Sequence, residues 1–127
     1  MTIVSLPPTY SKDANVTLLI QMEVSFAEGR TQDFFDCFAK DVVWDCVGDQ
    51  IRVGKENMQK FVLEMGGYTA EKIEIASVIV AENMGSISGT LFSKDGGQIK
   101  FCDVIEFDTL GHKIQKITSY AIEIKKV

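Results

Sequence analysis

The chain of 127 residues has the size of one ordinary domain, in which folding removes roughly two-thirds of the unfolded surface from water. Apolar residues make up 46% and charged residues 24%, which is typical of a packed globular protein and excludes a disordered or fibrous chain. The formal net charge of -5, with the basic residues scattered, disfavours a nucleic acid as the partner.

Other properties of the sequence limit where the protein can be located and which cofactors it can bind. No apolar run approaches the roughly 20 residues that span a bilayer, and residues 1–11 lack the charged-then-apolar order of a signal peptide. We therefore expect a cytoplasmic protein that does not bind membranes. Cys37, Cys46 and Cys102 are widely spaced and are expected to stay reduced. With His112 as the single histidine, no metal site is predicted.

The first part of the chain predicts two helices. Residues 10–13 offer caps for a helix that runs to about Glu28, before Gly29. Thr31 caps a second, short helix that ends near Lys40. This second helix buries a face of three phenylalanines, Phe34, Phe35 and Phe38.

A strand and a third helix follow. Residues 41–47 are rich in β-branched and aromatic side chains and stop at a turn, which predicts a strand. After Gly54, apolar residues recur at helical spacing until Gly66 and Gly67 end the helix. These apolar residues are Met58, Phe61, Val62 and Met65.

The remainder predicts four strands, over residues 72–81, 85–93, 98–107 and 113–125. Turns separate them at residues 82–83, 95–97 and 110–111. Consecutive strands with short connections should form an antiparallel meander. Helices first and strands later indicate one α+β domain over residues 1–127, with the helices on one face of the sheet.

One strand contains a polar residue on an apolar face. Alternate residues of strand 98–107 share a face, and Asp103 is the one charged member of the face that includes Phe101 and Ile105. An isolated carboxylate there costs several kcal/mol, so Asp103 must be paired, hydrogen-bonded, protonated or beside water in a cavity.

The first helix shows a similar break. At about 100° per residue, the apolar arc that includes Leu19 and Phe26 has Glu23 near its middle. Two acids on inward faces could share a site, where burial and mutual repulsion would raise a pKa into the range that proton transfer uses. In the competing interpretation, Asp103 is an internal acid that is salt-bridged to a lysine or hydrogen-bonded to loop amides, and Glu23 reaches solvent at the edge of the helix.

Other residues are candidates for a site around these acids. Cys46 is a weak candidate for a nucleophile, because no histidine lies near it in the sequence. His112 is expected to be a solvent-exposed turn residue, and the sequence leaves open which face of the last strand Tyr120 occupies. Trp44 and Cys46 share a strand face and belong either to the wall of this site or to the core. The residues expected to contact a ligand are Met22, Trp44, Cys46, Phe61, Met65 and Phe101.

Several local strings are informative together with the order of the elements. They lie at residues 26–30, 33–44, 54–58, 107, 111–114 and 118–120. They resemble the nuclear transport factor 2-like superfamily, which includes SnoaL-like polyketide cyclases and ketosteroid isomerases. The resemblance implies three N-terminal helices on a strongly curved, mostly antiparallel sheet that forms a cone with an internal pocket. It also implies a homodimer, as in many members.

When the chain is aligned with ketosteroid isomerase, Met22 occupies the position of the oxyanion-hole tyrosine and Cys46 that of the general-base aspartate. Both are departures from the family pattern. Asp103 falls where that enzyme carries an aspartic acid that its apolar site keeps protonated. The resemblance therefore favours a pocket and makes steroid isomerisation by the known mechanism doubtful.

Two functions of different classes follow from the sequence. The first is a cofactor-independent isomerase, cyclase or lyase that acts on a small apolar carbonyl or polyketide-like compound, with Asp103 as the acid and Glu23 as the base. The second is a non-catalytic module that binds a small apolar ligand or dimerises. Under either, a homodimer is expected through the outer sheet face, which carries Cys102 and Val104.

Overall fold

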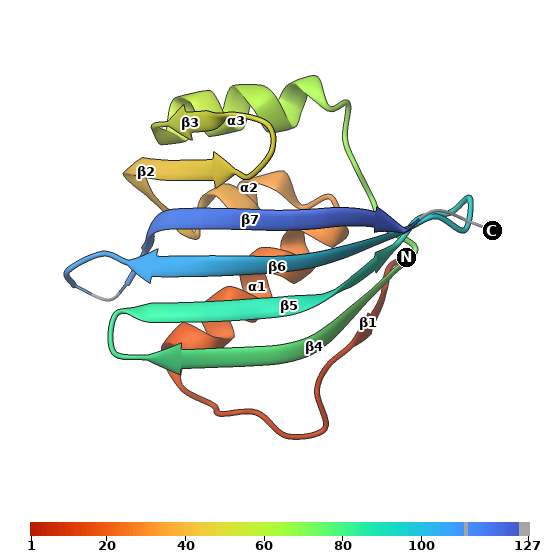
Figure 1. Ribbon diagram of the computed structural model, residues 1–127, viewed down its shortest axis with the longest axis horizontal. Helices are drawn as coiled ribbons and strands as arrows, with labels where there is room; N and C mark the ends of the chain where they lie inside the picture. Colours follow the sequence, from red (N-terminus) through yellow and green to blue (C-terminus); the bar gives the residue numbers. More distant parts are fainter. Residues whose placement is uncertain (111, 125–127) are drawn as a thin grey trace.

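The computed structural model describes residues 1–110 and 112–124, which form three helices and one sheet of seven strands (Figure 1). This confirms the α+β class. The helices are α1 (Ala14–Ala27), α2 (Thr31–Phe35) and α3 (Lys55–Glu64). The strands are β1 (Ile3–Ser5), β2 (Phe38–Cys46), β3 (Ile51–Val53), β4 (Lys72–Ala81), β5 (Met84–Phe92), β6 (Gln98–Phe107) and β7 (Ile114–Ile124).

The strands lie in the order β1-β4-β5-β6-β7-β2-β3. The predicted meander is present, because β4, β5, β6 and β7 pair with one another antiparallel. Two strands from the first part of the chain extend it: β1 pairs with β4 and β2 pairs with β7, both in parallel. The sheet is therefore mostly antiparallel, with one parallel pair on each side of the meander.

The helices cover one face of this sheet, with α1 behind the meander and α3 beside β3 (Figure 1). They are not one N-terminal block, since β1 precedes α1, and β2 and β3 separate α2 from α3. The strong curl that the resemblance implies is not seen in Figure 1. The central strands β5 and β6 pair without a break along their length, whereas register shifts interrupt the β4–β5, β6–β7 and β2–β7 pairs.

Several element boundaries differ from the sequence prediction. The second helix ends at Phe35 rather than near Lys40, because Phe38 pairs with Ile114 of β7 and so begins a strand. The strands β1 and β3 were not predicted. Gly111 of the predicted turn at 110–111, and Lys125, the predicted end of the last strand, lie outside the described residues.

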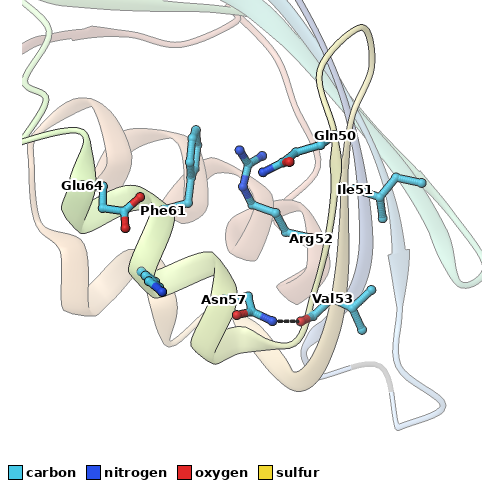
Figure 2. A pocket seen from close by; sticks show the side chains of 8 residues that line it. Gln50, Ile51, Arg52, Val53, Asn57, Phe61 and Glu64 are labelled. Atoms are coloured by element: carbon cyan, nitrogen blue, oxygen red, sulfur yellow. Dashed lines mark hydrogen bonds between the residues drawn. The ribbon is translucent and has the colours of Figure 1, made fainter.

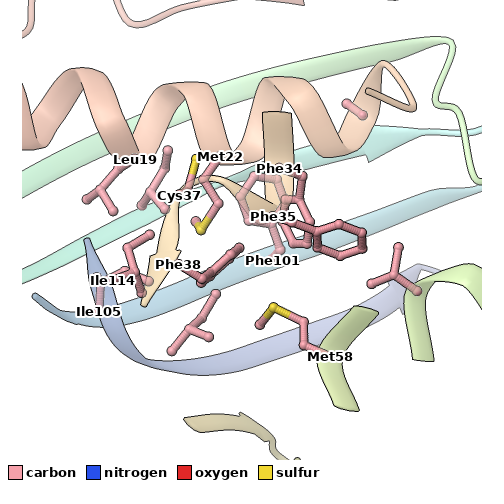
Figure 3. Packing of buried hydrophobic residues seen from close by; sticks show 14 of the residues in the cluster. Leu19, Met22, Phe34, Phe35, Cys37, Phe38, Met58, Phe101, Ile105 and Ile114 are labelled. Atoms are coloured by element: carbon pink, nitrogen blue, oxygen red, sulfur yellow. The ribbon is translucent and has the colours of Figure 1, made fainter. Parts of the chain in front are cut away.

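The core lies between the helices and the sheet (Figure 3). Asp13 caps α1 as predicted, since its Oδ1 accepts a hydrogen bond of 2.9 Å from the Asn15 amide. The inward side of α1 then buries Leu19 and Met22 completely. In β6 the predicted alternation is confirmed, because Phe101, Asp103, Ile105 and Phe107 are the buried members of the strand.

Candidate functional site

The structure brings Glu23 of α1 and Asp103 of β6 to the same cavity, from opposite layers of the fold. Their exposed fractions are 6% and 7%. Glu23 therefore does not reach solvent at a helix edge, and neither acid makes an ion pair with a described basic side chain. These observations exclude an ion pair with a basic side chain as the explanation for either buried acid. The explanations that remain are a hydrogen bond between the two acids and protonation beside the cavity.

The cavity has a volume of about 200 Å³ and a mostly apolar wall. Of the predicted ligand contacts, Met22, Trp44 and Phe101 line it. Its polar groups are Glu23, Asp103 and Ser119. The other lining residues are Phe26, Phe34, Leu91, Ile99, Ile117 and Ala121.

The electrostatics of the pair depend chiefly on burial. Desolvation raises the pKa of Glu23 well above its ordinary value, and the negative charge of Asp103 and a hydrogen bond between the two carboxyl groups raise it further. This arrangement favours the protonated form of Glu23. The Oε1 atom of Glu23 is buried and has no hydrogen-bond partner among the described residues. An unsatisfied buried oxygen of this kind is available to a ligand.

Ser119 is a polar wall residue that sequence reasoning missed. It pairs across the strands with Asp103, and its Oγ accepts a hydrogen bond of 2.9 Å from Trp44 Nε1. Because the indole N–H is the donor, the serine hydroxyl keeps its own hydrogen for another acceptor. The contact also fixes the Trp44 ring in the cavity wall.

The strand register settles the phase of β7. Residues opposite Asp103 and Phe101 are Ser119 and Ala121, so these two face inward. Tyr120 lies opposite Cys102 and therefore faces away from the cavity. His112 is exposed, as predicted for a turn residue.

Three predicted ligand contacts lie outside this cavity. Met65 lines a separate small hollow with Tyr68, and Phe61 lines an open groove with Arg52. The Cys46 Sγ accepts a contact of 3.5 Å from Arg52 Nη1. Burial raises the pKa of the Cys46 thiol despite the opposing charge of Arg52, so this thiol is not an activated nucleophile.

In residues 1–110 and 112–124, no three His, Cys, Asp or Glu side chains gather as a metal site. Within the same residues, no helix has the length and apolar character needed to cross a bilayer.

The geometry supports acid–base chemistry on a ligand in the cavity. Glu23, whose pKa is raised, and Asp103 both border an apolar space. Such a pair can give a proton to one atom of a ligand and take a proton from another.

No model of a protein family matches the sequence, and no curated protein matches it. Solved structures do match. A nuclear transport factor 2-like protein of unknown function from Burkholderia xenovorans is 16% identical, with a TM-score of 0.75, over 89% of this chain and 87% of that chain. A candidate SnoaL-like polyketide cyclase from Shewanella putrefaciens is 10% identical, with a TM-score of 0.74, over 87% and 81%.

A candidate ketosteroid isomerase from Kribbella flavida is also similar, with 15% identity and a TM-score of 0.71 over 89% of this chain and 81% of that chain. At such identities the likeness concerns the fold, because one fold carries many functions. The chain thus has the fold of the nuclear transport factor 2-like superfamily, which confirms the resemblance seen in its sequence.

Proposed function

We propose that the protein binds a small, mostly apolar carbonyl or polyketide-like compound in its cavity and moves a proton on it, as a cofactor-independent isomerase, cyclase or lyase. The observation that carries this proposal is the buried Glu23–Asp103 pair, with an unpartnered Glu23 oxygen in an otherwise apolar wall. Structures of this fold that are named as a candidate isomerase and a candidate cyclase support it by analogy.

The volume of the cavity limits the size of the substrate. An apolar cavity of about 150 Å³ accommodates benzene. A cavity of about 200 Å³ therefore suits a compound with one substituted ring or a short chain, rather than a four-ring steroid. This agrees with the absence of the isomerase tyrosine and general base from the positions of Met22 and Cys46.

The raised pKa of Glu23 favours roles that are the reverse of those expected from the sequence. In this proposal Glu23 is the acid and Asp103 is the base. Asp103 removes a proton from the carbon beside the carbonyl, and the C–H electron pair becomes the carbon–carbon double bond of an enol. The carbonyl oxygen receives the Glu23 proton. Where that carbon also adjoins a carbon–carbon double bond, Asp103 returns the proton to the far end of the conjugated enol. The enol hydroxyl gives its proton back to Glu23 as the carbonyl forms again, which completes an isomerisation with both carboxyl groups in their starting states.

Carboxyl-carbon NMR of the wild type, Glu23→Gln and Asp103→Asn tests the pair directly. In the wild type, the Glu23 carboxyl should titrate well above the range of a solvent-exposed glutamate. In Asp103→Asn its pKa should fall but stay raised, because burial, the largest cause, remains. An ordinary Glu23 titration in the wild type would contradict the proposal.

The apolar wall also supports a second function, non-catalytic binding of a small ligand. Ligands can be found by measuring the melting temperature of the protein in the presence of each of a panel of small carbonyl compounds. A molecule that binds only the folded state raises this temperature. With a compound that binds, the catalytic proposal expects Asp103→Asn to lower kcat/KM by roughly 10²- to 10⁴-fold. A compound that binds but is not converted would favour the second function, non-catalytic ligand binding.

We further propose a homodimer through the outer face of the sheet. Tyr120, Ile122 and Ile79 are exposed there, with exposed fractions of 47%, 66% and 62%. Cross-strand pairing places Tyr120 beside Cys102 and Ile122 beside Lys100, which gives the mixed apolar and charged character of many interfaces. We also propose that the protein works in the cytoplasm, where its free cysteines would stay reduced.

A further inference from the structure

A second hollow, separate from the acid cavity, lies between β3 and α3 (Figure 2). This groove has a volume of about 550 Å³, and its charged lining residues are Arg52, Lys60 and Glu64. Of the three side chains of β3, Arg52 points toward α3, while Ile51 and Val53 point away (Figure 2). The strand thus presents one cation to the groove.

Arg52 is unusually buried for an arginine, with an exposed fraction of 9%. Its guanidinium carbon lies 3.5 Å from the centre of the Phe61 ring and 5.8 Å from that of Trp44. Stacking on these two rings holds the guanidinium in one orientation. A buried cation held in this way requires a negative partner to offset its lost hydration.

The partners present in the described residues are weak. Arg52 Nη2 lies 3.3 Å from Asp49 Oδ2, but the Asp49 side chain is 63% exposed. The other side-chain contact of Arg52 is the 3.5 Å approach of Nη1 to the Cys46 thiol, which carries no formal charge while protonated. Neither contact uses the two parallel N–H groups that a guanidinium offers to a carboxylate.

From this geometry we propose that the groove between β3 and α3 binds the carboxylate of a small ligand, with Arg52 as the main contact and Lys60 as a second positive charge. A singly charged group fits better than a phosphate, because Glu64 lines the groove and Asp49 borders Arg52. This site is distinct from the proposed acid–base cavity. The Trp44 and Phe61 rings, which meet edge to face at 5.4 Å, lie between the two.

Trp44 gives the site its own signal, since it is the one tryptophan of the chain and lies near Arg52. Acetate should change its fluorescence in a saturable way, in a titration against chloride at constant ionic strength. Phosphate should bind more weakly than acetate. Tighter binding of phosphate would overturn the carboxylate assignment.

Charge variants then locate the site. Arg52→Gln should weaken acetate binding by about tenfold to a hundredfold. Lys60→Gln should weaken it and Glu64→Gln should strengthen it, each by about twofold to fivefold. Both of these residues are exposed, so the pair of opposite effects remains measurable if Arg52→Gln does not fold. Arg30→Gln is the matched control, because the other arginine of the chain lies outside the groove and pairs with Glu28.

Two further results would overturn the proposal. The first is no saturable response to acetate, which would leave Arg52 as a structural brace between Phe61 and Asp49. The second is binding that strengthens in Asp103→Asn and does not change in Lys60→Gln or Glu64→Gln. That pattern would place the acetate in the acid cavity, which Trp44 also lines.

Discussion

Folding and protonation are linked at Glu23. Its pKa is raised in the folded protein, whereas in the unfolded chain a glutamate has a pKa of about 4.3. Between these two values the folded protein holds a proton that the unfolded chain has released. The stabilisation from this proton is complete below about pH 4.3 and is lost as the pH rises through the folded-state pKa.

The pH dependence of stability in Glu23→Gln measures this linkage. Because glutamine does not titrate, the variant should gain stability relative to the wild type as the pH rises, by about 1.4 kcal/mol per pH unit within the window. Urea unfolding at a series of pH values gives the difference. The exposed Glu71→Gln controls for the loss of one negative charge. A constant difference between Glu23→Gln and the wild type would rule out the linkage.

The two acids were predictable because each interrupts an apolar face whose period is clear. Ser119 was not predictable, because the inward residues of β7 do not keep one period. Ile114 and Ile117 are both buried although three positions apart, since the register between β6 and β7 shifts after Glu106. A shift of one residue turns every following side chain to the other face, so the phase of Tyr120 could not be settled from the sequence.

At the scale of elements, Gly89 permits a close approach of two strands. Gly89 of β5 lies opposite the irregularity in β4 between Ile75 and Ser77. A Cβ atom built on Gly89 would lie 2.0 Å from the carbonyl oxygen of Glu74. The backbone of β4 would have to move to admit it, because no flexible side chain is there to yield.

Gly89→Ala should therefore destabilise the protein by roughly 3 kcal/mol or more, which thermal or urea unfolding measures. Gly97→Ala is the control. Its Cβ would first meet a side-chain oxygen of Asp95 at 3.1 Å, and a surface change of this kind typically costs about 0.5 kcal/mol or less. Equal stability of the two variants would show that β4 adjusts freely at this point.

The long elements were predictable because their pattern of apolar residues repeats several times. The short elements were not predictable. β1 and β3 have three residues each, too few to display an alternation. The end of α2 was misplaced because Phe34, Phe35 and Phe38 fit a helical face equally well. Pairing with β7, a contact distant in sequence, decides that Phe38 belongs to a strand.

The same reason accounts for the three predicted ligand contacts that lie outside the acid cavity, Cys46, Phe61 and Met65. Helical spacing groups Phe61 and Met65 with Met58 and Val62, but Met58 and Val62 are the buried pair. Phe61 and Cys46 both contact Arg52, so the position of β3, which carries Arg52, determines their surroundings. The periodicity of α3 contains no information about an edge strand that was itself not predicted.

At the scale of the whole molecule, the proposed homodimer predicts how charge on the sheet would act. Light scattering at micromolar concentration should find a dimer of the wild type. Tyr120→Lys with Ile122→Lys should give a monomer, because it places two charges in an apolar contact. Leu63→Lys, at a residue of α3 that is 64% exposed, should remain a dimer. A wild type that is strictly monomeric at this concentration would exclude the outer-face interface.

The pairing of β2 with β7 has a consequence for the order of events during folding. The hydrogen bond from Trp44 to Ser119 joins side chains 75 positions apart, and β7 also contributes Ile117 and Ala121 to the wall of the cavity. Contacts between such distant parts form late, because the intervening chain must first be ordered. On the ribosome, the helices and β4 to β6 emerge before β7, so the wall around Glu23 and Asp103 is completed only when β7 joins the sheet. The cavity is therefore not formed until β2 and β7, two strands distant in sequence, have paired.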